Sequence, residues 1–223
     1  MKKKGILILF DCNNISETNY KKMKGYVSEY RQEKAEKYYH YHDKVLSVVA
    51  EFSLFYLMRK YYCIDRRMIK ILRQDKGKPF FKEGYMPKFN LSHTNNLTAV
   101  LVANCEVGID VENINSQTQK SLKQIMEFVF SNEEIAKIES EKEDMVNQFF
   151  KTWTYREAYY KMMGKGLSVS DFKKNIPRIN DSFSFDFNKY CISICGILED
   201  DVKKIVMDEK NIVNMCECIN EEI

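Results

Sequence analysis

The order of the predicted strands and helices restricts the fold of this chain more than any single motif does. The first part begins with an apolar, strand-like run at residues 5–10 and continues with residues 43–62, whose apolar side chains recur at helical spacing. Residues 68–73 then predict a strand, and residues 97–112 predict two strands that pair as a hairpin turning near residues 104–106. The first part is therefore predicted to run strand, long helix, strands.

The same order returns in the second part. Its predicted helices are residues 121–130, 132–139 and 147–163, and its predicted strands are residues 182–186, 190–198 and 203–208. Ser131 and Glu134 form a capping box at the start of the second helix, and Gly164 ends the third. No sequence repeat accompanies this order, so the two parts, which meet near Ile114, are related by their elements only. We expect an α+β fold.

Composition limits the function without defining it. The chain of 223 residues is long enough for one large domain or two small ones, and its 44% hydrophobic and 30% charged content is typical of a globular protein. A net charge of +3 is too small to indicate nucleic acid as a partner, although a local basic patch could face an anionic ligand.

The N-terminal residues resemble a signal peptide only briefly. The apolar run after Lys4 is six residues long and Asp11 follows it, which favours a first strand. No apolar run approaches the length of a transmembrane helix. The seven cysteines are odd in number and lack C-x-x-C spacing, as expected of reduced thiols. We therefore expect a cytoplasmic protein with no membrane partner.

Two short segments place acidic and basic side chains together. Asp110 and Glu112 are two residues apart in an apolar run, so both carboxylates point to one face of a strand. Trp153, Glu157 and Lys161 recur every four residues and share one face of a helix. Three carboxylates and an ammonium suit Mg²⁺ with a phosphate substrate. Taken separately, each segment favours the simpler interpretation, solvated acids at a strand end and a surface ion pair on a helix.

Four motifs in a fixed order add a more specific signal. They are Gly77-Lys78-Pro79-Phe80, then Phe89-Asn90-Leu91-Ser92-His93-Thr94, then Gly108-Ile109-Asp110-Val111-Glu112, and finally Trp153 to Lys161 followed by Gly164-Lys165-Gly166-Leu167. Their order resembles that of the 4′-phosphopantetheinyl transferases of the Sfp type, over a region from about Arg31 to Leu167. The resemblance implies two similar α+β halves that pack as a pseudo-dimer, here residues 1–113 and 114–223. It also implies an active site between the halves and a monomeric protein.

The resemblance further implies a reaction. Enzymes of this type transfer the 4′-phosphopantetheine arm of coenzyme A to a serine of an apo acyl or peptidyl carrier protein and release 3′,5′-ADP. Asp110, Glu112 and Glu157 match the acids that hold Mg²⁺, for which Mn²⁺ can substitute. Glu157 is also the expected general base, and Lys161 is expected to neutralise charge on the pyrophosphate.

Five further residues match positions that contact coenzyme A. These are Arg31, Lys34, Lys78, Ser92 and His93. Arg31 and Lys34 lie in a charge-rich segment, where a solvated helix face is nearly as good an interpretation. Leu46 stands where the family usually has Arg, so one nucleotide contact is missing or comes from elsewhere, for example from Lys44.

Residues 121–130 are a candidate docking surface for the carrier. Leu122, Ile125, Met126 and Val129 form an apolar stripe at helical spacing, which could equally be core, and Lys120 and Lys123 could meet an acidic carrier helix. Two other functions remain open at this point: a different Mg²⁺-dependent phosphate enzyme such as a nuclease, and a non-catalytic protein that binds carriers.

Overall fold

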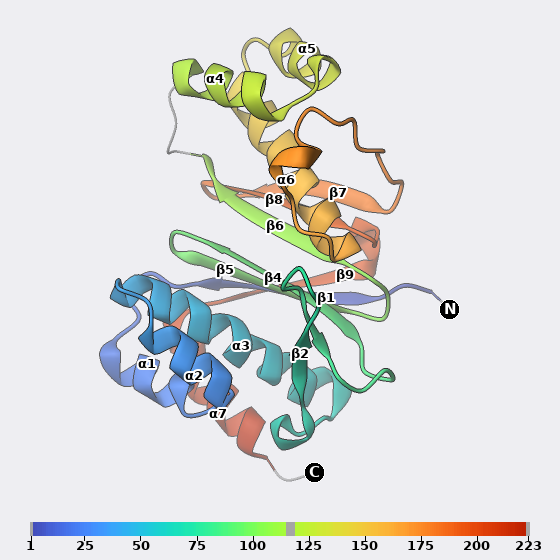
Figure 1. The fold of residues 1–223 in the computed structure, drawn as a ribbon. Helices are drawn as coiled ribbons and strands as arrows, with labels where there is room; N and C mark the ends of the chain where they lie inside the picture. Colours follow the sequence, from blue (N-terminus) through green and yellow to red (C-terminus); the bar gives the residue numbers. More distant parts are fainter. Residues whose placement is uncertain (1, 115–118, 222–223) are drawn as a thin grey trace.

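Two β-sheets lie face to face in the middle of the structure, and helices cover the outer face of each sheet (Figure 1). The computed structural model describes residues 2–114 and 119–221, except for the side chains of residues 119–121. Within these residues the strand orders are β4-β5-β1-β9, β6-β8-β7 and a separate β2-β3 hairpin. None of the described helices is long and apolar enough to cross a membrane.

The first sheet carries the N-terminal helices. Its strands are β1 (Gly5–Asp11), β4 (Lys88–Thr94), β5 (Leu97–Ala103) and β9 (Val202–Met207). The helices on its outer face are α1 (Glu17–Lys24), α2 (Glu29–Glu36), α3 (Tyr41–Tyr62) and α7 (Ile212–Asn220). The β2-β3 hairpin (Ile71–Arg73 and Pro79–Phe81) lies between α3 and β4 along the chain. The long α3 confirms the helix predicted at residues 43–62.

The second sheet is built in the same way. Its strands are β6 (Gly108–Asn113), β7 (Ser182–Phe187) and β8 (Tyr190–Cys195), and its helices are α4 (Gln119–Val129), α5 (Asn132–Ser140) and α6 (Met145–Met163). The predicted capping box of Ser131 and Glu134 is present at the start of α5. Gly164 ends α6 in the left-handed conformation, at a φ of 68°, which a glycine adopts without steric cost.

The two halves share one topology. In the first half β1 leads through α3 to the antiparallel pair β4 and β5, and β5 returns to pair antiparallel with β1. In the second half β6 leads through α6 to the antiparallel pair β7 and β8, and β8 pairs antiparallel with β6. The prediction of two similar α+β halves is therefore confirmed, although the repeat is one of topology and not of sequence.

Alternating side chains divide the buried surface of β1 between two cores. Leu7 and Leu9 point into the core between the two sheets, together with side chains of β5, β6 and β8. Ile8 and Phe10 point to the opposite face and pack in the core formed with α3. Because successive side chains of a strand point to opposite faces, a strand between two cores has to be apolar at nearly every position.

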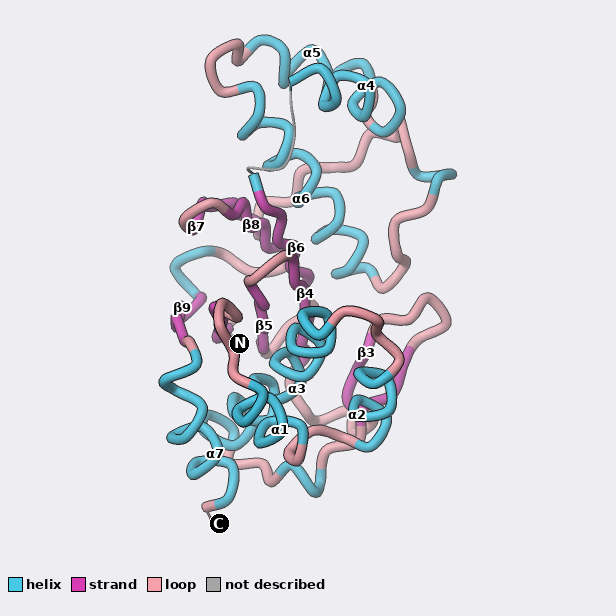
Figure 2. The backbone as a smooth tube through the Cα atoms, turned by 90° about the vertical axis from the view of Figure 1, so that its left-hand side faces the viewer, coloured by secondary structure: helices cyan, strands magenta, loops and turns pink. Residues whose placement is uncertain are grey.

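Two predictions about the strands are corrected. Residues 97–112 do not form a hairpin: β5 pairs with β1 and β4, whereas β6 crosses to the other sheet and pairs with β8. The expected boundary after residue 113 also does not coincide with the division between the sheets. β6 precedes it but belongs to the second sheet, and β9 follows it but pairs in parallel with β1. Figure 2 shows the same arrangement from the side.

Candidate active site

The candidate site lies where α6 crosses β6, and Gly108 allows the two elements to approach closely. A Cβ atom at this position would lie 1.9 Å from the carbonyl oxygen of Ala158 and 2.5 Å from the backbone nitrogen of Met162. Any other residue at position 108 would therefore push α6 away from β6. This contact explains on physical grounds why a glycine begins the Asp110-Val111-Glu112 strand.

A Gly108→Ala variant should consequently be less stable than the wild type. Overpacking a tight contact costs about 1–3 kcal/mol, so the free energy of unfolding in urea should fall by at least that amount. Gly84→Ala is the matched control, because no atom lies within 4 Å of its added Cβ. Equal unfolding midpoints for the two variants would contradict the close approach of α6 and β6.

Asp110, Ser92 and Lys161 form a closed triangle of hydrogen bonds at this crossing. Asp110 is 4% exposed. Its Oδ1 accepts bonds from the Lys161 ammonium at 2.6 Å and from the Ser92 hydroxyl at 3.0 Å, and the ammonium also bonds the Ser92 oxygen at 3.0 Å. The three residues come from β6, β4 and α6. The site is therefore assembled from both halves of the chain.

Glu112 and Glu157 are half-buried next to this triangle. Burial raises the pKa of Glu112 to about 7, and the negative charge of Asp110 adds to the rise. Burial also raises the pKa of Glu157, Asp110 acts in the same direction, and Lys161 opposes both. Asp110, Glu112 and Glu157, here called the carboxylate cluster, repel one another in their ionised forms. A cation between them would relieve this repulsion.

The carboxylate cluster is suited to a divalent cation whose coordination shell is completed by ligands other than protein side chains. The Oδ2 atom of Asp110 is buried and has no hydrogen-bond partner among the described residues. Within the same part of the chain, no three Asp, Glu, His or Cys side chains are already grouped as a metal site. Mg²⁺ usually binds one or two carboxylates and takes its other ligands from water and substrate phosphates. The donors present suit that mode of binding, in which Asp110, Glu112 and Glu157 share the cation with other ligands.

His93 lies on the solvent side of β4, next to Ser92. Its ring is accessible to solvent but surrounded by protein on most sides, and this partial burial lowers its pKa. The positive charges of Lys161, Arg31 and Lys34 lower the pKa further, while Asp43 opposes them. Cations therefore outnumber acids around His93. Such surroundings favour a phosphate group.

Arg31 is not placed as a phosphate ligand. Its side chain is 9% exposed, and its Nε bonds Glu51 at 3.0 Å while its Nη1 bonds the Ser47 hydroxyl at 3.0 Å. The guanidinium thus joins α2 to α3 as a buried ion pair. The neighbouring Lys34 is half-buried and close enough to affect His93. Of the predicted basic pair, Lys34 alone remains a candidate for direct contact.

Lys78 also lies apart from the carboxylate cluster. Its ammonium bonds Glu106 at 3.2 Å, the carbonyl of Val107 at 3.4 Å and the carbonyl of Met162 at 2.9 Å. Burial lowers its pKa, and Glu106 acts in the opposite direction. A cation at the C-terminal end of α6 is favourable because the last carbonyl groups of a helix have no partners within it. Lys78 therefore fastens the crossover between the sheets to the end of α6.

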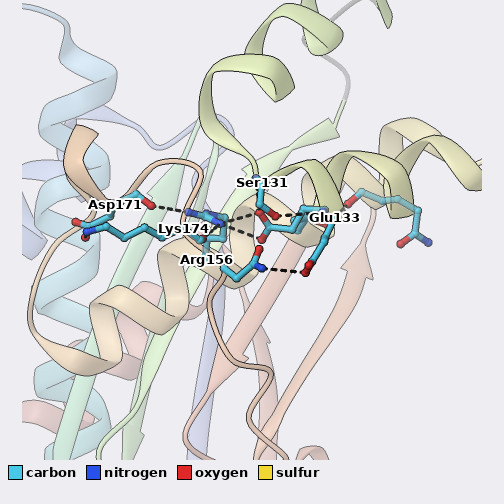
Figure 3. A network of polar contacts seen from close by, with 9 residues as sticks. Ser131, Glu133, Arg156, Asp171 and Lys174 are labelled. Atoms are coloured by element: carbon cyan, nitrogen blue, oxygen red, sulfur yellow. Dashed lines mark hydrogen bonds and ion pairs between the residues drawn. The ribbon is translucent and has the colours of Figure 1, made fainter.

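Arg156 stabilises the helical layer above the second sheet (Figure 3). It is fully buried, and its Nη1 bonds both carboxylate oxygens of Glu134 at 2.9 Å. Its remaining bonds go to the carbonyls of Lys174 and Asp171, at 3.0 and 2.9 Å. Although Arg156 directly precedes Glu157, it points away from the carboxylate cluster and connects α5 to the loop after α6.

The apolar stripe of α4 is core. Leu122, Met126 and Val129 are at most 4% exposed and pack with α5 and α6. Of the two interpretations of this stripe, the core interpretation is therefore confirmed. Lys123 is exposed and lies 3.9 Å from Glu139. The side chain of Lys120 lies outside the described residues.

Lys44, which could have replaced the nucleotide contact that an arginine at position 46 would make, is paired with another residue. Lys44 bonds Glu36 at 3.2 Å, and Leu46 is buried in the core below the first sheet. The sequence analysis also missed a contact: the Trp153 indole, expected only to pack, donates a bond to Glu112 at 3.3 Å. The shared helical face of Trp153 and Glu157 was the signal that could have indicated it.

A cavity of about 760 Å³ opens beyond the C-terminal end of α6. It is lined by residues 73–76 and Phe80 of the β2-β3 hairpin on one side, and by Gly164, Lys165, Ser168 and Asp171 on the other. Gly164 follows Lys161 by one helical turn. The cavity therefore adjoins the end of the helix that carries Lys161, although Asp110, Ser92 and Lys161 do not line it.

Comparisons with known proteins identify the class to which these two halves and their shared site belong. Residues 14–106 match the family model "4′-phosphopantetheinyl transferase, N-terminal", and residues 106–195 match the model of the 4′-phosphopantetheinyl transferase superfamily. The two matched regions meet at residue 106, in the crossover before β6. The chain belongs to the 4′-phosphopantetheinyl transferase superfamily, a family of enzymes.

Individual relatives give the same result. The chain is 24% identical over 156 residues to the 4′-phosphopantetheinyl transferase Sfp of Bacillus subtilis, covering 70% of this chain and 68% of Sfp. It is 29% identical over 161 residues to the 4′-phosphopantetheinyl transferase gsp of Aneurinibacillus migulanus, covering 70% and 64%. A Candida glabrata L-aminoadipate-semialdehyde dehydrogenase-phosphopantetheinyl transferase is 32% identical over 143 residues, covering 57% and 55%. The chain thus matches about two thirds or less of the length of these relatives.

Proposed function

We propose that this protein transfers the 4′-phosphopantetheine arm of coenzyme A to a serine of an apo carrier protein. The observation that carries the proposal is the triangle of Asp110, Ser92 and Lys161 beside Glu157, in a chain of this family. The serine oxygen attacks the β-phosphorus of the pyrophosphate. The bond between the β-phosphorus and the bridging oxygen breaks, and 3′,5′-ADP leaves with that oxygen. Such a reaction depends mainly on positioning and on stabilising charge.

The carboxylate cluster would hold Mg²⁺ or Mn²⁺ in this proposal. Oδ2 of Asp110 is available for a cation, and Glu112 and Glu157 lie beside it. A bound divalent cation supplies neutralisation of the pyrophosphate charge. A net charge of only +3 does not favour a nuclease, which needs a strongly basic surface for its polyanionic substrate.

Protein residues would act on both substrates, the carrier serine and coenzyme A. Glu157 is the proposed general base for the attacking serine, since its raised pKa brings a carboxylate closer to neutral pH. The Lys161 ammonium would donate hydrogen bonds to the pyrophosphate oxygens and neutralise their charge. His93 would donate to a phosphate, with Lys34 beside it. The cavity beyond α6 would take a part of coenzyme A outside its phosphates.

The remaining assignments follow from the same proposal. The partner is an apo carrier protein of the acyl or peptidyl type, coenzyme A is the co-substrate, and the enzyme acts as a monomer in the cytoplasm. A monomer suffices because the triangle of Asp110, Ser92 and Lys161 draws its residues from both halves of one chain. A second subunit is therefore not needed to complete the site.

A single assay tests the transfer. The purified protein is incubated with coenzyme A, Mg²⁺ and a panel of apo carrier proteins, and each carrier is weighed by mass spectrometry. We expect a mass gain of one phosphopantetheine group on at least one carrier and none on the same carrier with its serine changed to alanine. Carrier binding without a mass gain across the panel would indicate a non-catalytic carrier-binding protein instead.

Coenzyme A binding should depend on His93. A hydrogen bond to a charged group contributes about 1.5–3 kcal/mol, so His93→Ala should weaken coenzyme A binding about ten-fold to a hundred-fold in calorimetric titrations. His40→Ala is the matched control, because His40 is exposed at the start of α3 and its side chain makes no capping bond.

The 3′-phosphate is the proposed partner of His93. Dephospho-coenzyme A should therefore bind the wild type more weakly than coenzyme A does, and His93→Ala should add no further loss for the dephospho form. Equal affinities of the wild type for the two ligands would refute this placement.

A further inference from the structure

The indole of Trp153 lies against one member of the carboxylate cluster. Its Nε1 donates a hydrogen bond of 3.3 Å to Oε1 of Glu112. Trp153 lies on α6 one turn before Glu157 and two turns before Lys161, so all three side chains leave the same face of the helix. It is also the single tryptophan of the chain.

The position of the indole is fixed by packing on its other side. The partly buried Trp153 packs against the apolar cluster of α4, α5 and α6, and the centre of its ring lies 6.5 Å from that of Phe130. An indole that is anchored in this way offers its N–H at a constant place. A bond to such a donor costs less conformational entropy than a bond to a long, mobile side chain.

Glu112 has no other donor to orient it among the described residues. The cation of the site, Lys161, bonds Asp110 and Ser92 rather than Glu112. Glu112 is only half-buried, and an unbound carboxylate at such a position can adopt several rotamers. The indole bond holds Oε1 and leaves Oε2 to another ligand.

We propose that Trp153 is a positioning residue, which orients Glu112 for a divalent cation through the indole N–H. The inference rests on the proposed function, because it assumes that the carboxylate cluster binds such a cation. Partners that hydrogen-bond to metal ligands commonly raise metal affinity by about ten-fold to a hundred-fold. Trp153 would act in this way while touching neither the cation nor the substrate.

The test measures Mn²⁺ binding to the 223-residue chain by the electron paramagnetic resonance signal of free Mn²⁺. Trp153→Phe retains an aromatic ring in the cluster and removes the N–H, so we expect Mn²⁺ to bind about ten-fold more weakly. Phe149→Leu is the control for packing, since Phe149 is buried in the same cluster. It should lower the thermal unfolding midpoint and leave Mn²⁺ affinity unchanged.

A double-mutant cycle with Glu112→Gln separates positioning from a general effect. If Trp153 acts through Glu112, Trp153→Phe should cause no further loss of Mn²⁺ affinity when Glu112 is already glutamine. The tryptophan emission of the wild type, excited selectively over that of tyrosine, should also change on adding Mn²⁺, because Trp153 is the single tryptophan. This change should shrink in Glu112→Gln.

The outcome does not depend on transfer activity. Coupling between Trp153 and Glu112 in Mn²⁺ binding supports the inference even if no carrier in the panel is modified. Equal Mn²⁺ affinities of the wild type and Trp153→Phe, or the same loss in both Glu112 backgrounds, would overturn it even in a fully active enzyme. A wild type that binds no Mn²⁺ overturns it as well.

Discussion

Asp110→Ala should reduce phosphopantetheine transfer to the background of the assay. Asp110 has the one buried carboxylate oxygen of the carboxylate cluster that lacks a partner among the described residues, and it also holds the Lys161 ammonium at 2.6 Å. The loss of Asp110 therefore removes a proposed ligand of the divalent metal ion. It also removes the hydrogen-bond partner that holds the Lys161 ammonium in place. The measurement is the rate of mass gain on a carrier at saturating coenzyme A.

The same variant should remain folded. Asp110 lies beside Glu112 and Glu157, whose pKa values it raises, so its removal relieves repulsion as well as breaking the bond to Lys161. We expect the thermal unfolding midpoint to stay within a few degrees of the wild type. Asp186→Ala, an exposed change on β7 at the other edge of the same sheet, is the matched control and should be fully active.

Metal removal provides an independent arm of this experiment. Wild-type protein in excess chelator should be as inactive as Asp110→Ala, and Mg²⁺ or Mn²⁺ should restore the wild type alone. Full transfer by Asp110→Ala, or by the wild type in chelator, would remove the metal assignment while leaving the transferase assignment intact.

Lys161→Ala should lower kcat about a hundred-fold to a thousand-fold. Its ammonium is in place before substrate arrives, because Asp110 and Ser92 hold it at 2.6 and 3.0 Å. A preorganised donor aimed at charge that develops in the transition state typically contributes that much to turnover. Steady-state rates with coenzyme A and a carrier measure the effect.

Whether Lys161→Ala changes kcat or the KM for coenzyme A tests the proposed role of Lys161 in the transition state. If Lys161 acts on developing charge, the KM for coenzyme A should change much less than kcat. Lys151→Ala, on another face of the same helix, should leave both constants near their wild-type values. A rise in the KM for coenzyme A with an unchanged kcat would make Lys161 an anchor for the bound substrate instead.

Local patterns along the chain were sufficient for most of the elements. The helical spacing of apolar residues predicted α3, the Ser131–Glu134 pair predicted the start of α5, and Gly164 predicted the end of α6. These features depend on residues only a few positions apart, so the sequence contains all of their physical causes. The topological repeat was visible for the same reason, as an order of elements.

Pairing between strands could not be predicted in this way. β5 and β6 are neighbours in the sequence, and both are almost entirely buried. A strand with two buried faces is apolar throughout, so its pattern does not indicate which partner it takes. The crossover to the second sheet depends on a close fit of Gly108 against α6, which only the folded chain reveals.

The sequence by itself determined which carboxylates share a face of their strand or helix. Only the tertiary structure decided which basic residues remain available for a ligand. Alternation on one strand placed Asp110 with Glu112, and four-residue spacing on one helix placed Glu157 with Lys161, because both periodicities are local. The crossing of α6 over β6 then brings the two pairs together. Arg31 and Lys78 were also predicted from the sequence to contact coenzyme A. In the structure Arg31 is paired with Glu51, and Lys78 bonds a carbonyl at the end of α6. A buried cation needs partners from distant segments, so folding decides which cations are left for a ligand.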